Sequence, residues 1–157
     1  MTDTVVYPIP DHFSEAHVTP ERYHTLYRQS LDDPDTFWSE QAQLLDWHSP
    51  WSAVSETDVA KGAARWFVDA KLNVSVNCID RHLPERAHDT AIIWEGDDPD
   101  DSQSFTYQEL KIQVCRFANA LRAQGIGKGD RVCIYMPMIP EAAFAMLACA
   151  RIGAIHS

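Results

Sequence analysis

The sequence predicts an α/β fold in which a helical and irregular arm precedes the start of a sheet domain. Aromatic residues in a helix-prone, acid-rich context characterise residues 13–51. An acidic turn between two strand-like stretches characterises residues 90–107, and an apolar strand, a helix and a second strand follow from Val132. A chain of 157 residues is long enough for one core, or for an arm with one small domain.

The arm is predicted to begin with two short helices joined by a turn at Asp33-Pro34. Thr19-Pro20-Glu21 provides an N-cap, a proline at the first helical position and an early acid, which together suit a helix start. From Asp46 to Phe67 few helical repeats occur, so we expect an irregular segment whose tryptophans anchor it on a larger body. Leu72–Cys78 alternates apolar and polar residues and predicts an extended or turn segment that enters a helix at Ile79.

After Pro84 the pattern predicts a β-hairpin followed by an amphipathic helix. Thr90–Glu95 and Gln103–Tyr107 are the two strands, and Gly96–Asp101 is the acidic turn. Thr106 and Glu109 have the spacing of a capping box. The apolar face of the helix that follows comprises Leu110, Val114, Phe117, Ala118 and Leu121.

The last part predicts a strand, helix, strand unit with a right-handed crossover. Val132–Met136 is apolar throughout, as expected of a strand buried on both faces. Pro140-Glu141 opens a helix, and Gly153 returns the chain to a strand at Ala154–His156. The inward residues of that helix are predicted to be Phe144, Met146, Leu147 and Ala150.

A composition shift near Pro84 predicts a boundary between an arm, residues 1–83, and an incomplete sheet domain, residues 84–157. Because the sequence stops just as the second parallel strand begins, we expect a truncated chain whose open sheet edge is covered by the rest of the domain.

Composition excludes several function classes. A formal net charge of -10 and a pI of about 5.0 give no basic surface for nucleic acid or anionic membrane. The first eight residues lack a secretory pattern, which predicts a cytoplasmic protein. The apolar stretch Val132–Ala150 is interrupted by Pro137 and Pro140, so we do not expect a membrane span. The four widely spaced cysteines are expected to be buried reduced thiols.

Three motifs invite a chemical interpretation, and each has a structural one that we prefer. Gly125–Asp130 follows a helix and feeds a strand, which is the reverse of a phosphate loop and predicts a helix end and turn. The acidic run Gly96–Asp101 lacks the ligand alternation of a calcium loop. Asp80-Arg81-His82 places neighbouring side chains in different directions, which favours ion pairing or capping. The histidines form no zinc-ligand pattern.

Several strings of the sequence resemble the AMP-forming acetyl-CoA synthetases, and the resemblance covers nearly everything after about residue 20. Ala70 departs from the glycine that is common in that family, which puts a left-handed backbone there in doubt. The resembling segments are Phe37–Trp47, Trp66–Phe67, Leu72–His82, Ile93–Asp97, Ile134–Glu141, Ala145–Arg151 and Gly153–Ser157.

The resemblance implies an adenylate-forming domain and a two-step ligase reaction. Acetate would attack ATP to give acetyl-adenylate and pyrophosphate, and the CoA thiol would then displace AMP, with Mg²⁺ neutralising phosphate charge. The family's phosphate loop, acyl and adenine pockets, CoA contacts and adenylation lysine would all lie beyond Ser157. We therefore assign no catalytic, cofactor-binding or metal-ligating residue in this chain, and we expect the chain alone to be inactive.

Three alternatives accompany this interpretation. The first is a propionyl-CoA synthetase, because the acyl pocket that would decide between the substrates is not in the sequence. The second is a non-catalytic interaction module derived from the family, which would bind a partner through its exposed strand edge. The third, a dinucleotide-binding enzyme, fails for want of a G-x-G-x-x-G motif after a strand.

Overall fold

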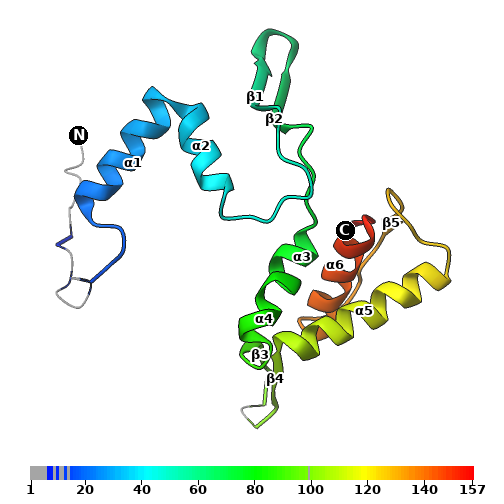
Figure 1. Cartoon of the computed structure of the whole chain (residues 1–157). Coiled ribbons are helices and arrows are strands. Elements are labelled where there is room, and N and C mark those ends of the chain that lie inside the picture. Colours follow the sequence, from blue (N-terminus) through cyan, green and yellow to red (C-terminus); the bar gives the residue numbers. More distant parts are fainter. Residues whose placement is uncertain (1–6, 9, 11–12, 14, 99) are drawn as a thin grey trace, which may run out of the picture. The chain divides into compact units, whose positions relative to one another are not determined.

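The computed structural model describes residues 7–8, 10, 13, 15–98 and 100–157. Residues 1–6, on which much of the argument against a secretory signal depends, lie outside the described residues. The chain forms two compact units, residues 1–44 and residues 45–157, which are described separately (Figure 1).

The first unit contains helices α1 (Pro20–Asp32) and α2 (Pro34–Ala42), which confirms the predicted pair. Thr19 caps α1 by accepting a hydrogen bond from Arg22 N at 3.3 Å, and Asp33 caps α2 by accepting one from Thr36 N at 3.2 Å. Each helix therefore begins at a cap followed by a proline, and the two helices contact each other.

The second unit begins with an antiparallel hairpin where we expected irregular structure. Strand β1 (Ala53–Asp58) pairs with β2 (Ala63–Val68) through a 3₁₀ turn, η2 (Val59–Lys61), that ends at Gly62 with φ of 64°. The prediction was wrong because both strands are short and largely solvent-exposed, so they show no long apolar alternation.

Three short helical segments lead from this hairpin to the core. They are α3 (Val74–Cys78), η3 (Asp80–His82) and α4 (Leu83–Arg86). The predicted extended segment at Leu72–Cys78 is wrong beyond Asn73, because the Asn73 side chain accepts a hydrogen bond from Val76 N at 3.2 Å and starts a helix there.

The hairpin predicted at residues 90–107 and the helix predicted after it are confirmed. Strands β3 (Thr90–Glu95) and β4 (Ser102–Thr106) pair antiparallel and lead into α5 (Tyr107–Ala123). Thr106 and Glu109 form the capping box: Glu109 N donates to Thr106 Oγ1 at 3.2 Å, and Thr106 N donates to Glu109 Oε2 at 2.8 Å.

The last part is a strand, helix, strand unit with two very short parallel strands, β5 (Arg131–Val132) and β6 (Ile155–His156). Helix α6 (Pro140–Ile152) lies between them in sequence. The prediction of a strand buried on both faces at Val132–Met136 is wrong, since Tyr135 is fully exposed and the strand ends at Val132. Met146, predicted to point inward, is 42% exposed.

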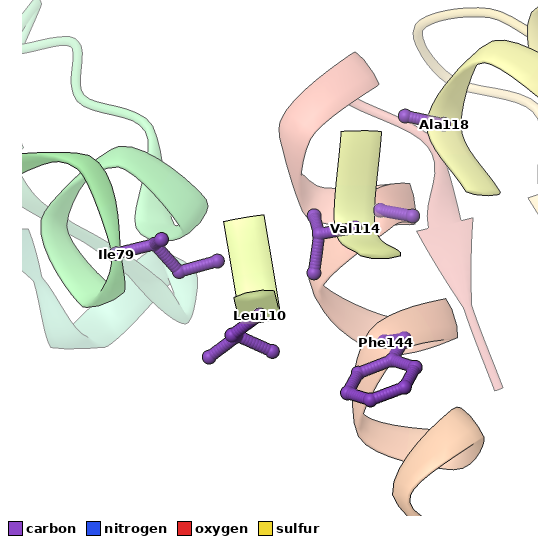
Figure 2. Packing of buried hydrophobic residues seen from close by; sticks show 6 residues of the cluster. Ile79, Leu110, Val114, Ala118 and Phe144 are labelled. Atoms are coloured by element: carbon purple, nitrogen blue, oxygen red, sulfur yellow. The ribbon is translucent and has the colours of Figure 1, made fainter. Parts of the chain in front are cut away.

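A buried hydrophobic cluster lies where α5, α6 and Ile79 meet (Figure 2). Leu110, Val114 and Ala118 line one face of α5, as the helical spacing predicted. Phe144 of α6 packs edge-on against Phe105 of β4, with ring centroids 5.2 Å apart. The core of this unit therefore joins elements from residue 79 onward.

The described residues contain no helix long and apolar enough to cross a membrane. All four cysteines are free, but only Cys149 is buried. The predicted burial is wrong for Cys78 and Cys133, which are exposed, and for Cys115, which is half-buried. Scattered small thiols carry little positional information in a single sequence.

Candidate functional site

The glycine turn Gly125–Asp130 lies between α5 and β5 and is closed by its own groups. Gly127 N donates to Asp130 Oδ2 at 2.8 Å, and Asp130 N donates to Gly127 O at 3.2 Å. Gly125 and Gly129 adopt positive φ values of 83° and 89°, which explains why glycine occurs there. The Asp130 carboxylate accepts the hydrogen bond of the Gly127 amide, which a bound phosphate would need. The turn is therefore structural, as predicted.

The acidic loop between β3 and β4 borders a hollow of about 440 Å³. Gly96 N donates to Asp101 O at 2.7 Å and Asp100 N donates to Asp98 Oδ1 at 3.0 Å, so the loop is held by its own backbone and by the Asp98 carboxylate. Trp94 Nε1 donates to Met138 O at 2.6 Å and ties the hairpin to the segment before α6. Pro99 lies outside the described residues.

Asp80 pairs with cations from two different helices. Lys111 Nζ of α5 lies 3.1 Å from Asp80 Oδ1, and Arg151 of α6 donates a hydrogen bond to Asp80 Oδ2. Partial burial raises the pKa of the Asp80 carboxyl, but hydrogen bonds and charge from Arg151 and Lys111 outweigh burial and hold that pKa below its ordinary value. Ion pairing, the structural interpretation, is therefore confirmed for Asp80.

The two neighbours of Asp80 point to other partners. Arg81 donates from NH1 to Asn77 Oδ1 at 3.2 Å. The His82 ring lies 5.2 Å from the Tyr107 ring, centroid to centroid. Asp80, Arg81 and His82 thus each contact different residues, and these three residues do not form an acid–base cluster with one another.

Two of the arm tryptophans pack within the arm itself, so their anchoring of the arm on a larger body stays a prediction. Trp47, Trp51 and Phe67 form a cluster with ring centroids 5.3 to 5.4 Å apart. Phe67 and Asp69 adopt the positive φ values of 47° and 63°, whereas Ala70 is not among the positive-φ residues described. Ala70 therefore does not adopt the left-handed backbone for which glycine would be needed.

Sequence reasoning missed two asparagines that link distant segments. Asn73 donates from Nδ2 to Ala150 O and to Arg151 O, both at 3.1 Å. Asn77 accepts from Asp46 N at 2.8 Å and donates from Nδ2 to Asp46 O at 3.0 Å. The N-cap position of Asn73 could have been found from local sequence, but the partners 77 and 78 residues away could not.

The polar groups described above connect helices of the second unit. Among the described residues, no group of three or more His, Cys, Asp and Glu side chains is arranged to hold a metal ion. The polar network of Asn73, Asp80, Lys111 and Arg151 consists of hydrogen bonds and ion pairs between helices, which fits a structural role.

Comparison with known proteins gives two consecutive family matches. Residues 23–78 match the family model described as acetyl-coenzyme A synthetase N-terminus, and residues 79–157 match the one described as AMP-binding enzyme. Together the two matches extend from Tyr23 to the last residue.

Individual relatives agree with the family matches. The chain is 68% identical over 142 residues to acetyl-coenzyme A synthetase 2 of Pseudomonas putida, which covers 90% of this chain and 22% of that protein. It is 60% identical over 159 aligned positions to acetyl-coenzyme A synthetase of Alkalilimnicola ehrlichii, which covers 100% of this chain and 25% of that protein. The chain thus spans about a quarter of the length of these curated relatives.

A solved structure shares the fold. Acetoacetyl-CoA synthetase from Streptomyces lividans superposes with a TM-score of 0.78 at 33% sequence identity. The superposition covers 93% of this chain and 23% of that one. The α/β arrangement of the chain is thus that of one part of a larger synthetase.

Proposed function

Because the chain belongs to the AMP-binding enzymes and carries the N-terminal region of the acetyl-coenzyme A synthetases, we propose that it is the N-terminal part of an acetate–CoA ligase. The proposed whole protein makes acetyl-CoA from acetate, ATP and CoA through acetyl-adenylate. The observation that carries the proposal is the 60% identity to an acetyl-coenzyme A synthetase along the whole chain.

ATP, CoA and Mg²⁺ are the proposed small molecules of the whole protein. Two observations on the described residues support sites elsewhere in the whole protein. Asp130 accepts the hydrogen bond of the Gly127 amide, and no group of three or more His, Cys, Asp and Glu side chains among those residues is arranged to hold a metal ion. We therefore derive no chemical step from this chain, and we propose that residues beyond it bind the substrates and perform the reaction.

The proposal extends to organisation and location. We propose that the chain divides into an arm of residues 1–83 and a sheet region of residues 84–157. The two family matches meet nearby, between Cys78 and Ile79, which supports this division. The rest of the adenylate-forming domain is the proposed cover of the β5–β6 sheet edge. A cytoplasmic location is proposed from the similarity to acetyl-coenzyme A synthetases.

The test uses the full-length protein expressed from its own gene. We expect ATP- and acetate-dependent pyrophosphate release, followed by CoA-dependent acetyl-CoA formation, with an intact mass several times the 17.8 kDa of this chain. Propionate and acetoacetate are assayed at the same concentration as acetate. If either gives a higher kcat/KM than acetate, it becomes the proposed substrate in place of acetate.

The matched control is the 157-residue chain expressed alone, for which we expect no pyrophosphate release. Activity of that chain would contradict the assignment of all the chemistry to residues beyond it. An intact natural product of 17.8 kDa without activity would instead favour the non-catalytic interaction module.

A further inference from the structure

The carboxyl end of α6 is capped by a side chain from far away in the sequence. The last carbonyls of a helix have no partner within the helix. Asn73 donates both hydrogens of its Nδ2 group to two of them, Ala150 O and Arg151 O, at 3.1 Å each. The Asn73 Oδ1 atom simultaneously accepts from Val76 N at 3.2 Å and caps α3. Gly153, with a φ of 77°, ends α6, and its N–H also donates to Ala150 O at 3.2 Å. The Asn73 side chain thus adds hydrogen bonds at this helix end and begins α3.

A second connection reaches α6 from Asp80, seven residues after Asn73. Asp80 of η3 accepts a hydrogen bond from Arg151 of α6 and pairs with Lys111 of α5 at 3.1 Å. The Asp80 and Arg151 side chains are only 23% and 20% exposed. Charge-assisted hydrogen bonds that are shielded from water are stronger than those at the surface.

Ile79 lies between these two connections and is completely buried in the cluster formed with α5 and α6 (Figure 2). The two polar connections therefore act on the last turn of α6, and Ile79 joins the apolar cluster that α6 shares with α5. We propose that Asn73 and Asp80 form a latch that makes the α3–η3 segment and α6 fold and open as one cooperative unit, although the family matches divide the chain between Cys78 and Ile79.

The latch lies at the end of the sheet opposite to the one where ligands usually bind. Helix α6 ends at Ile152 and passes through Gly153 directly into β6, so the latch lies at the amino end of that parallel strand. In open parallel sheets, ligands bind at the carboxyl ends of the strands. The latch therefore acts on assembly of the region, and its effect is independent of the proposed ligase reaction.

The test compares variants of the full-length protein by hydrogen–deuterium exchange. Asn73→Asp keeps an acceptor for Val76 N but cannot donate to the two carbonyls, and it places a negative charge at the unfavourable end of the α6 dipole. We expect amides of residues 149–154 to exchange about tenfold faster or more, together with those of α3. Asp80→Asn should act in the same direction.

Asp89→Asn is the matched control, because it also removes a carboxylate from an arginine partner. The Arg86–Asp89 pair is about half-exposed at both ends, so this variant should leave exchange of α6 unchanged. A folded Asn73→Asp protein with unchanged exchange in α6 would overturn the latch.

If the Asn73→Asp protein does not fold, the unmodified protein decides the question. We measure hydrogen exchange at increasing urea concentration. The opening free energies of the α3 amides and of the amides in the last turn of α6 should have the same value and the same dependence on urea concentration. Separate openings with different urea dependences would overturn the proposal.

Discussion

At the scale of single residues, Asp80 illustrates how a carboxylate becomes structural. Its two partners come from different helices, α5 and α6. Their hydrogen bonds and their charge keep the Asp80 pKa below its ordinary value despite partial burial. A lowered pKa in the folded state means that ionisation of Asp80 stabilises the fold. The stabilisation depends on pH in a direction that can be tested.

We predict that Asp80→Asn destabilises the protein by about 1 kcal/mol at neutral pH, because the pair is only partly shielded from solvent. The contribution of Asp80 is complete above the unfolded-state pKa of about 4. It is lost as the pH falls through that value towards the lower pKa of the folded state. Urea unfolding of both proteins between about pH 3 and pH 7 should show the difference disappearing at the acidic end.

The control for this pH dependence is Asp89→Asn, whose difference from the unmodified protein should stay small at every pH because the Arg86–Asp89 pair is exposed. A gap between Asp80→Asn and the unmodified protein that widens on acidification would contradict the direction assigned to the Asp80 pKa.

Ser75 offers a prediction of opposite sign. Its side chain is completely buried on α3, and its Oγ atom has no hydrogen-bond partner among the described residues. An unpaired buried hydroxyl costs about 1 kcal/mol or more. We predict that Ser75→Ala leaves the free energy of unfolding unchanged or raises it by up to about 1 kcal/mol, measured by urea denaturation.

Asn77 provides the comparison on the same helix, since it is also buried but makes two hydrogen bonds with the Asp46 backbone. Asn77→Ala should lower the free energy of unfolding by about 1 to 3 kcal/mol. Loss of stability of similar size in Ser75→Ala would indicate that the Ser75 hydroxyl has a partner, for example a buried water molecule.

At the scale of elements, the helix starts are where stability can be changed locally. The capping box of α5 depends on reciprocal hydrogen bonds between Thr106 and Glu109. We predict that Thr106→Ala destabilises the protein by about 1 kcal/mol, whereas Thr106→Ser retains the hydroxyl and most of the stability. Thermal unfolding of the two variants is the measurement, and equal losses would show that the Thr106 methyl group, and not its hydroxyl, matters.

The same locality explains which elements could be predicted from sequence. Thr19-Pro20, Thr106 with Glu109, and Pro140-Glu141 each mark a helix start by residues that act within one turn, and α1, α5 and α6 begin there. The β1–β2 hairpin was missed, although the turn at Gly62 between two β-prone stretches was a usable signal.

Strand β5 shows the limit of apolar patterning. Val132–Met136 is apolar as a buried strand should be, yet only two residues pair with β6 and Tyr135 is fully exposed. Apolarity predicts that a segment will be covered, and burial depends on which neighbours are present to cover it. The apolar pattern therefore predicted burial of Val132–Met136, but among the described residues no neighbour covers Tyr135.

At the scale of the whole molecule, family membership was easier to predict than packing. The resemblance was apparent from short strings of residues, and both family matches confirm it. The connections between Asn73 and α6 span 77 and 78 residues, so no local pattern contains them. The absence of assigned site residues stays a prediction, because the structure describes about a quarter of the length of the relatives.

The division of the chain into units yields the last prediction. The compact units meet between Leu44 and Leu45, whereas the family matches meet between Cys78 and Ile79. All residues of the buried cluster come from residue 79 onward, but the latch residue Asn73 lies before it. We predict that deleting residues 1–44 from the full-length protein leaves hydrogen exchange of α5 and α6 unchanged, whereas deleting residues 1–78 accelerates exchange of α6 by at least about tenfold.

The two deletions separate the physical explanations. The shorter one leaves Asn73, α3 and Asp80 in place, and the longer one removes the cap of α6 together with α3 while it keeps Ile79 and Asp80. If both deletions accelerate exchange in α6 equally, residues 1–44 stabilise α6 and the boundary at Leu44 is wrong. If neither does, the region from Ile79 folds without its arm, and the family boundary is also the folding boundary.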